Sequence, residues 1–217
     1  MAKTKKADAP KAKENASYLE KNKVAPKPSK ANSAKFEPTE DADMSIALLD
    51  PKDGLQKLFC DSIKDIYWAE NQLVKALPKM ASAASVPELK DAILSHLNET
   101  RMQVTRLEKV FELLSKKPQA KKCDAMEGLT KEGEGVIEDT DKASPARNLG
   151  IIMASQKVEH YEISAYTGLI KLAQKLGLPE EIATLLSESL SEEEAADETL
   201  GGIADSSIDF YEEGEEA

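Results

Sequence analysis

The chain reads KVEHYEISAY from Lys157 to Tyr166, and the interpretation of the whole sequence starts from this stretch. It lies within residues 151–176, where apolar side chains recur at the spacing of a helix. Glu159 and Glu162 are three residues apart, so they lie one turn apart on the same side of that helix. Glu162 falls at the edge of the apolar stripe or inside it, where a carboxylate is unfavourable unless something pairs with it. The sequence therefore predicts a long helix that carries an acid on its core side.

The composition favours an all-α protein. The chain has 217 residues, enough for one ordinary domain and a tail, with 41% hydrophobic, 32% charged and only 5% aromatic residues. Valine and isoleucine form no alternating runs, and Ala, Leu, Lys and Glu dominate. The formal net charge of -11 argues against the folded body as a general nucleic-acid binder, because phosphates would be repelled.

Cysteine usage and hydropathy indicate the expected compartment. The two cysteines, Cys60 and Cys123, form neither a zinc-type spacing nor a disulfide framework. The sequence contains no apolar run of membrane-spanning length and no hydrophobic region typical of a signal peptide. We therefore expect a soluble cytoplasmic protein without a membrane partner.

The two ends of the chain differ in composition from its middle. Residues 1–50 are rich in Lys, Ala and Pro with almost no large apolar residues before Met44, so we expect a disordered tail. Lysines outnumber acids as far as Lys35, which fits either a solubilising tail or an arm that contacts DNA phosphates. Targeting remains a third possibility. Residues 206–217 are expected to be a loose acidic tail.

The intervening residues 51–205 predict four long helices and one short one. The expected segments are 55–83, 85–116, 123–138, 144–176 and 179–203. Asp50 or Asp53 is the expected N-cap of the first helix and Ser85 that of the second, where Glu88 has capping-box spacing. Short connections make antiparallel hairpins of the first and last pairs, and the longer middle link can cross between them. This is the connectivity of a four-helix bundle with one crossover and a minor helix.

Turn residues and proline refine these boundaries. Pro78 is expected to kink or loosen the first helix, because it removes a backbone donor. Three glycines are expected to interrupt the short helix: Gly128, Gly133 and Gly135. Ser144-Pro145 begins the third long helix, and the segment from Leu176 to Pro179 ends it.

Every long helix carries acids in or beside its apolar stripe. These acids are Glu70, Glu99, Glu159, Glu162, Glu193 and Asp197, with His96, Gln103, Tyr67 and Tyr166 nearby. Each lies near the middle of its helix, so an antiparallel bundle brings them to one level. Buried carboxylates at one level either hold protons or bind cations. Oxygen ligands with an imidazole suit iron or manganese. Helical bundles of this kind bind two such metal ions, bridged by carboxylates.

Each residue taken alone also has an ordinary interpretation. A single acid at a stripe edge, such as Glu99 or Glu193, more often faces water. A lone histidine such as His96 is more often structural, and Glu159 could pair with a lysine such as Lys157. Glu70 is hardest to explain in this way, since apolar residues flank it at both helical spacings. The agreement of four helices favours a metal site.

At these residues the chain resembles the YciE/YciF-type bacterial stress proteins of the ferritin-like superfamily. The likeness spans about residues 55–204 and leaves the N-terminal tail outside. It rests on Tyr67-Trp68-Ala69-Glu70, His96-Leu97-Asn98-Glu99-Thr100 with Gln103, Cys123–Leu129, Lys157–Ile163, and Glu192-Glu193 with Asp197. The resemblance implies a ferritin-like fold, a homodimer, and a di-iron site with ferroxidase activity.

The chain departs from the usual ferritin-like motif in one respect. Typical members carry Glu-x-x-His on two helices, whereas here Met102 follows Glu99 and Ala196 follows Glu193 at that spacing. Gln103 and Asp197 stand one position further on, and His96 precedes its glutamate. Fewer imidazoles imply a harder, carboxylate-rich site, and no cysteine cluster supplies a built-in electron donor.

Three hypotheses follow. The first is a protein that binds two iron ions, or manganese, and oxidises Fe(II) with oxygen or peroxide. Its expected ligands are Glu70, His96, Glu99, Gln103, Glu159, Glu162, Glu193 and Asp197. Tyr67 or Tyr166 is the candidate catalytic residue that supplies a hydrogen bond or an electron. The second is a non-enzymatic stress protein that contacts DNA through its lysine-rich tail and has a structural metal or none. The third is an oxygenase for an organic substrate.

Overall fold

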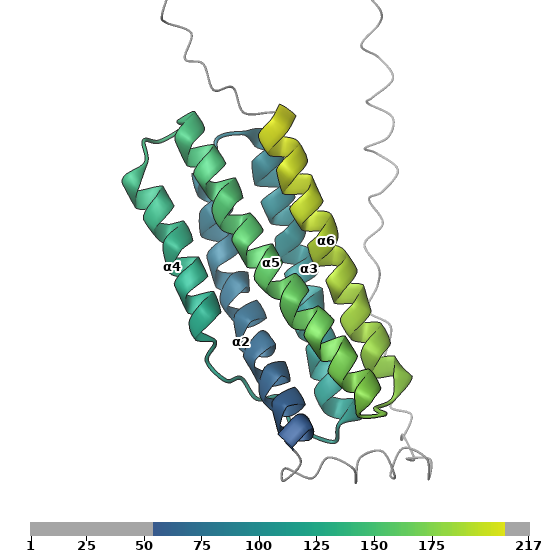
Figure 1. Cartoon of the computed structure of the whole chain (residues 1–217). Coiled ribbons are helices and arrows are strands. Elements are labelled where there is room, and N and C mark those ends of the chain that lie inside the picture. The colour runs from purple at the N-terminus through teal and green to yellow at the C-terminus, as the bar shows by residue number, and fades with distance from the viewer. Residues whose placement is uncertain (1–53, 207–217) are drawn as a thin grey trace, which may run out of the picture. The chain divides into compact units, whose positions relative to one another are not determined.

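The computed structural model describes residues 54–206, so both expected tails and the candidate caps Asp50 and Asp53 lie outside it, apart from Ser206. Within this range the chain forms five helices and no strand (Figure 1). They are α2 (Gly54–Ala83), α3 (Pro87–Leu113), α4 (Asp124–Asp139), α5 (Pro145–Lys175) and α6 (Glu180–Ser206). The prediction of an all-α fold is confirmed.

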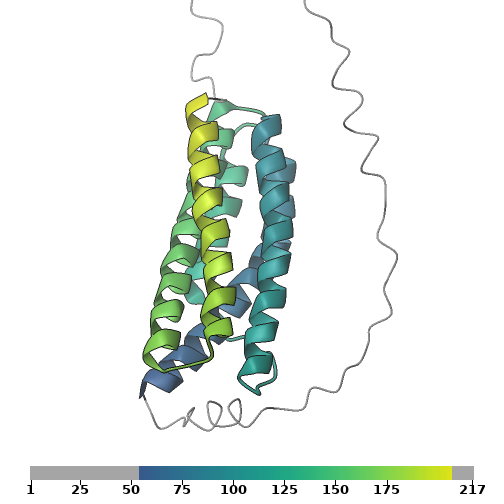
Figure 2. The ribbon, with the colours of Figure 1, turned by 90° about the vertical axis from the view of Figure 1, so that its right-hand side faces the viewer.

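The four long helices lie side by side, and α4 packs outside them. Each long helix contacts two others: α2 and α6 both contact α3 and α5. The helix α4 contacts only α2 and α5 extensively, so it lies on one face of the group (Figures 1 and 2). In Figure 1 the chain leaves α3 at the lower end of the long helices. The helix α4 then runs upward, and α5 begins at the upper end. The middle link therefore carries the chain from one helical pair to the other.

The helices α3 and α5 end in the same kind of C-terminus. After α5, Gly177 has a φ of 63°, and the Leu178 N–H donates to the Ala173 carbonyl at 3.0 Å. After α3, Ser115 takes the same left-handed conformation with a φ of 51°, and the next N–H donates back to Phe111 at 2.8 Å. These are Schellman motifs. The second of them ends α3 at Leu113, three residues before the predicted end at 116.

The N-terminus of α5 is as predicted, whereas that of α3 is not. Ser144 caps α5 by accepting a hydrogen bond from the Arg147 N–H at 3.1 Å. The residue at the N-cap of α3 is Val86, and no side chain caps that helix. Ser85 instead exchanges hydrogen bonds with Asn148 of α5, at 2.9 Å and 2.8 Å. The expected Ser85 cap is therefore wrong, because this serine ties the α2–α3 loop to α5.

The helix α4 is continuous, so the predicted interruptions at its glycines are wrong. Its position against α5 depends on Gly150, where a Cβ atom would lie only 2.6 Å from Val136 Cγ1. The buried guanidinium of Arg147 then binds its last turn, donating to the Ile137 carbonyl at 2.7 Å and to the Thr140 hydroxyl at 3.1 Å. Packing against two neighbours outweighs the low helix propensity of glycine.

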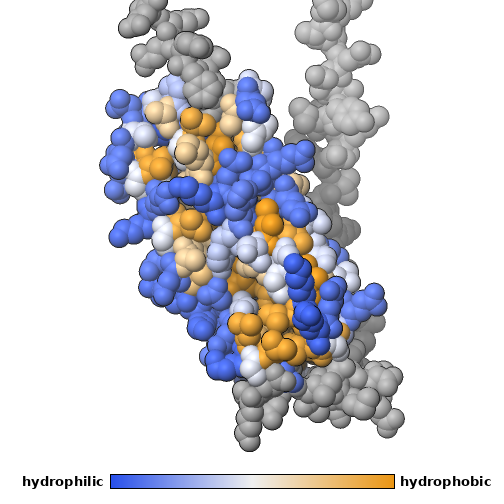
Figure 3. Space-filling view, in the orientation of Figure 1, coloured by the Kyte–Doolittle hydropathy of each residue, from blue (hydrophilic) through white to orange (hydrophobic). Residues whose placement is uncertain are grey.

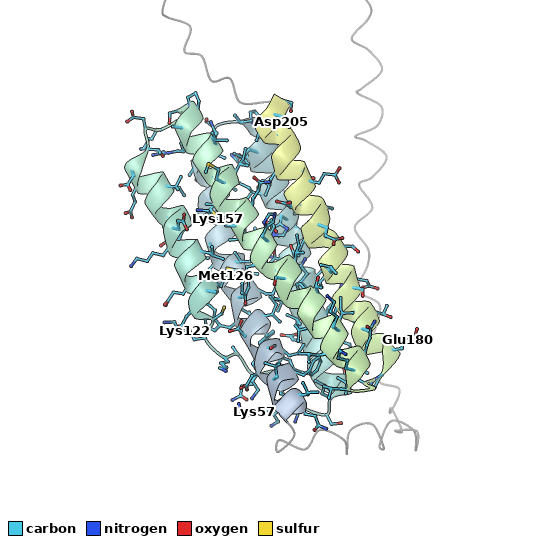
Figure 4. All side chains as sticks on the ribbon, in the orientation of Figure 1. Lys57, Lys122, Met126, Lys157, Glu180 and Asp205 are labelled. Carbon is cyan, nitrogen blue, oxygen red and sulfur yellow. The ribbon has the colours of Figure 1, made fainter. Side chains whose placement is uncertain are left out.

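The interior is built from the apolar stripes, and the outside is charged. Met126 of α4 is fully buried on the inner side, whereas Lys122 and Lys157 point outward (Figure 4). Figure 3 shows hydrophilic side chains over much of this face, with patches of hydrophobic ones between them from the upper to the lower end. Leu58 of α2 is half-exposed. None of the helices in residues 54–206 is long and apolar enough to cross a membrane.

Two further expectations concern helix interiors. Pro78 lies inside α2, which continues to Ala83 without ending at the proline. The helix α6 continues through Gly201 and Gly202 to Ser206, beyond the predicted end at 203. In both cases the helix is held by its neighbours, so local propensity does not set its end.

Candidate metal centre

Four buried side chains converge near the middle of the long helices. They are His96 from α3, Glu159 and Glu162 from α5, and Glu193 from α6. Each offers one nitrogen or oxygen atom, and these four atoms all lie within 4.8 Å of one another. Each residue follows the apolar stripe of its helix, so packing of the stripes is what brings the polar groups together. The group could hold a metal ion.

Glu70 of α2 adds a fourth helix to this group. Its side chain is fully buried, and one carboxylate oxygen accepts a hydrogen bond from the hydroxyl of Tyr166. Its charge interacts with those of Glu193 and His96. We call these five residues the acid–histidine cluster: Glu70, His96, Glu159, Glu162 and Glu193.

Many polar atoms of the cluster are buried without a hydrogen-bond partner. Both carboxylate oxygens of Glu162 and of Glu193 are in this state, as is one oxygen each of Glu70 and Glu159. Both ring nitrogens of His96 also lack a partner. Unsatisfied buried polar atoms are rare because each costs about 1–3 kcal/mol. Carboxylate oxygens and an imidazole are suitable donors for iron or manganese, so these residues fit the metal that the sequence predicts.

Burial raises the proton affinity of the acids. It raises the pKa of Glu70, Glu162 and Glu193 well above the ordinary carboxyl value, and neighbouring carboxylates raise the pKa of Glu162 further. Burial also raises the pKa of Glu159 to about 8. Without a cation, protons therefore neutralise part of the cluster at neutral pH.

His96 stands between an outer acid and two inner ones. Its Nδ1 atom is 3.6 Å from a carboxylate oxygen of Glu99, and its Nε2 atom is 3.5 Å from Glu159 and 3.7 Å from Glu193. Burial lowers the pKa of His96, but the acids of Glu99, Glu193 and Glu70 outweigh this effect and the pKa is raised. The neighbouring His96 ring lowers the pKa of Glu99.

Two predicted ligands lie outside the four converging groups. The Glu99 side chain is 41% exposed and lies outside the four converging groups. Asp197 accepts hydrogen bonds from Gln156 at 3.0 Å and lies 3.2 Å from the ring of exposed His160. Asp197 follows Glu193 by four residues, and the small rotation over that step turns it toward the surface of α5.

Two more predicted residues have hydrogen-bond partners outside the cluster. Gln103 is fully buried: its amide nitrogen donates to Glu192 at 3.1 Å, and its amide oxygen makes no hydrogen bond within residues 54–206. The hydroxyl of Tyr67 donates to exposed Glu108 at 3.0 Å, and its ring packs edge-on against Phe111 at a centroid distance of 5.5 Å. Tyr67 therefore faces α3 away from the cluster, whereas Tyr166 contacts Glu70 directly.

The sequence did not predict a set of ion pairs between α3 and α6. Arg106 donates two hydrogen bonds to Glu192, at 2.6 Å and 2.5 Å, and a third nitrogen lies 3.2 Å from Glu188. Glu192 lies in a run of acids, which is typical of a solvent-exposed segment. In the structure it pairs with Arg106 and also accepts a hydrogen bond from Gln103. The only sequence signal is an arginine one turn beyond the motif.

A second missed group lies between α2, α4 and α5. The hydroxyl of Tyr161 donates to Asp65 at 2.6 Å and lies 3.1 Å from the buried thiol of Cys123. The same sulfur accepts from the Met126 N–H, so Cys123 caps α4. Burial raises the pKa of Tyr161 and of Cys123, which keeps both groups neutral. The contact between Cys123 and Tyr161 thus joins the segments Cys123–Leu129 and Lys157–Ile163, which lie far apart in the chain.

Comparison with known proteins identifies the family. Residues 54–212 match the family described as Domain of unknown function (DUF892). The chain is 44% identical to Protein YciF of Escherichia coli (strain K12) over 151 residues, which are 69% of this chain and 90% of that protein.

Solved structures agree with this match. The crystal structure of the E. coli stress protein YciF superposes with a TM-score of 0.66, covering 69% of this chain and 94% of YciF at 44% identity. YcfI of Rhodopseudomonas palustris, for which a structural role has been suggested, gives a TM-score of 0.65 at 40% identity, covering 69% of this chain and 94% of YcfI. The chain therefore belongs to the DUF892 family and is a relative of the stress protein YciF.

Proposed function

We propose that the protein is a ferritin-like di-metal protein that binds two iron ions in the acid–histidine cluster and oxidises Fe(II) in protection against iron and oxidative stress. The observation that supports this most strongly is the set of carboxylate and imidazole atoms buried without hydrogen-bond partners. A cation is the group that satisfies such atoms all at once. The membership in a stress-protein family supports the biological setting.

The arrangement of helices also supports a ferritin-like site. Two helical pairs, α2–α3 and α5–α6, are joined by a link that contains α4, and each of the four long helices contributes to the cluster. In ferritin-like di-iron proteins the ligands likewise project inward from all four helices. The single imidazole makes this site richer in carboxylates than the usual one.

The chain's own residues have distinct tasks in this proposal. Glu162 and Glu193 have both carboxylate oxygens free of hydrogen bonds, so each can contact two cations. Tyr166 holds one oxygen of Glu70 and leaves the other free. These acids would release the protons that burial holds on them when they hold cations. Bound iron supplies electrons for the reduction of oxygen or peroxide.

The test is to load the protein with Fe(II) under anaerobic conditions, measure metal content by elemental analysis, and then follow absorbance in oxygen. We expect about two irons per chain and a ferric absorption band after oxygen is added. Replacing Glu193 with Gln removes one carboxylate at nearly constant shape and should abolish this stoichiometry. Glu194→Gln is the matched control, because Glu194 is the exposed neighbour.

Several outcomes would count against the proposal. Iron content that is unchanged in Glu193→Gln would show that the cluster is not the site. A wild-type protein that binds no stoichiometric metal would refute the di-metal function altogether. Loading with Mn(II) in parallel decides between the two metals. Light scattering tests the homodimer that the family resemblance implies.

A second candidate function is association with DNA through the lysine-rich residues 1–35. The observation that favours it is the excess of lysine over acid in this segment, in a chain that is otherwise acidic. Lysines that neutralise phosphates release counterions from DNA, so the binding should weaken steeply with salt. A gel shift at low salt that disappears when residues before 43 are deleted would support it. Unchanged DNA mobility with the full-length protein would refute it.

A further inference from the structure

A cavity of about 130 Å³ leads from the outside to the acid–histidine cluster between α3 and α6. Glu99 and Ser95 of α3 and Thr199 of α6 line it, and His96 and Glu159 line it as well. The space exists because three positions on its walls are alanines: Ala92, Ala195 and Ala196. One buried water needs about 10–15 Å³ of such volume, so the cavity has room for a partly hydrated ion.

Three polar side chains of the cavity become less exposed to solvent from its mouth inward. The Glu99 side chain is 41% exposed, that of His96 is 7% exposed, and that of Glu159 is 2% exposed. The His96 ring separates the outer acid from the inner ones, since Nδ1 is 3.6 Å from Glu99 and Nε2 is 3.5 Å from Glu159. One imidazole is thus within reach of an outer carboxylate and of the cluster.

Two buried atoms in the cavity wall make no hydrogen bond within residues 54–206. These are the Nδ1 atom of His96 and the hydroxyl oxygen of Ser155, whose residues are 6% and 4% exposed. The nearest charged group to the Nδ1 atom is the Glu99 carboxylate, at 3.6 Å. Together with Glu99 they provide a nitrogen, a hydroxyl and a carboxylate around a space that water can reach.

The charge of the cavity selects the kind of ligand. Within residues 54–206, the residues that line it include two acids and no lysine or arginine. Arg106 interacts with the charge of Glu99, but its guanidinium is already bound by Glu192 and Glu188. A cleft of one charge concentrates ions of the opposite charge and can raise association rates by about 10 to 10³-fold. Anions are repelled here and cations are attracted.

We infer that this cavity is a transit site for a divalent cation, which Glu99 and the Nδ1 atom of His96 bind on its way to the acid–histidine cluster. The inference rests on the proposed di-metal function and assigns Glu99 a role outside the cluster. One carboxylate and one imidazole, completed by water, hold a divalent ion more weakly than the carboxylate-rich interior does. A transit site must bind weakly so that the ion can move on.

The test follows binding of Co(II), whose visible absorption reports coordination without oxygen or turnover. Stopped-flow mixing gives the association rate, and equilibrium dialysis gives the final amount bound. Glu99→Gln keeps the shape and removes the charge, so we expect the association rate to fall about tenfold while the final amount stays at the wild-type value. Glu194→Gln makes the same charge change on the exposed side of α6 and should leave the rate unchanged.

A second variant tests the space independently of the charge. Ala196→Leu fills the cavity with a residue that suits a helix and leaves all the cluster ligands in place. We expect slower Co(II) association with an unchanged final amount, and circular dichroism verifies that the helices are intact. Wild-type rates in both Glu99→Gln and Ala196→Leu would overturn the inference.

The remaining outcomes separate this inference from the proposed function. A lower final amount of Co(II) in Glu99→Gln would make Glu99 a permanent ligand and would overturn the transit role alone. A wild-type chain that binds no stoichiometric Co(II) or Fe(II) would overturn the di-metal function, and the transit site with it.

Discussion

At the scale of single residues, Glu193 is a proposed metal ligand that we expect to destabilise the metal-free protein. Its carboxylate is fully buried without a hydrogen bond, and burial raises its pKa well above the ordinary value. We predict that Glu193→Gln raises the free energy of unfolding of the metal-free protein by about 1–3 kcal/mol. Thermal unfolding in the presence of a chelator measures this as a higher Tm, by roughly 2–4 °C for each kcal/mol.

The matched variant Glu194→Gln should leave that Tm within about 1 °C of the wild type, because surface substitutions cost little. With Fe(II) added, the order should reverse: the wild type gains stability from the ligand and Glu193→Gln does not. A metal-free Glu193→Gln protein that unfolds at a lower temperature than the wild type would contradict the idea that this acid is strained in the absence of a cation.

The raised pKa of Glu159 predicts that the stability of the metal-free protein depends on pH. The unfolded chain loses this proton near its ordinary pKa of 4.5, whereas the folded chain keeps it until about 8. Between these values the folded state binds more protons, so the free energy of unfolding falls as pH rises, by about 1.4 kcal/mol per pH unit for each such group. We predict this decline for the metal-free protein in urea titrations across the range.

The difference between the wild type and Glu159→Gln isolates this contribution, since the variant should show a flatter pH profile. Metal binding should show the opposite trend, because cations bind to the deprotonated acids and affinity therefore rises with pH. A wild-type profile that matches that of Glu159→Gln would show that Glu159 is already ionised in the folded, metal-free protein.

Much of the candidate site could be predicted from single residues, and the parts that could not be predicted have physical reasons. Glu70 and Glu162 interrupt apolar stripes, so helical spacing alone places them inside. Gln103 also lies inside, but its partner Glu192 comes from another helix, and spacing along one helix carries no information about such a partner. Tyr67 lies one turn from Glu70 and still points to Glu108, because the direction of a side chain at a stripe edge depends on its neighbours.

At the scale of helices, the C-termini of α3 and α5 offer a paired prediction. Ser115 and Gly177 occupy equivalent left-handed positions, with φ of 51° and 63°. Glycine takes this conformation without the steric cost that a Cβ atom brings. We predict that Ser115→Gly stabilises the protein and Gly177→Ala destabilises it, each by about 0.5–1 kcal/mol. Chemical denaturation measures both.

Ala143 extends this comparison, because it also has a positive φ, of 58°, in the loop before α5. Ala143→Gly should resemble Ser115→Gly if backbone strain is the cause. If Ser115→Gly is neutral while Gly177→Ala is destabilising, contacts of the serine side chain offset the strain at that position.

The sequence predicts helices better than it predicts their boundaries. The Ser144 cap and the Gly177 terminus could be located because their residue types are specific for those positions. The end of α3 could not, since a serine replaces the expected glycine there. The glycines of α4 suggested interruptions, but only the packed structure shows that Arg147 and Gly150 hold that helix in place.

At the scale of the whole molecule, the all-α fold could be predicted from composition and helical periodicity, because both are properties of the sequence alone. The position of α4 against α2 and α5 required the structure. So did the cavity between α3 and α6, since small residues on two distant helices create it and neither sequence segment is unusual by itself.

The distribution of the acid–histidine cluster over four helices has a consequence for motion. A cation bound there would connect α2, α3, α5 and α6 as a cross-link does, whereas α4 contributes no residue to the cluster. Opening of any one long helix would then require loss of the ion. Hydrogen–deuterium exchange should therefore slow on metal binding at the amides around the cluster residues in all four long helices together. The amides of α4 should keep their metal-free exchange rates, which makes this helix the internal reference for the other four.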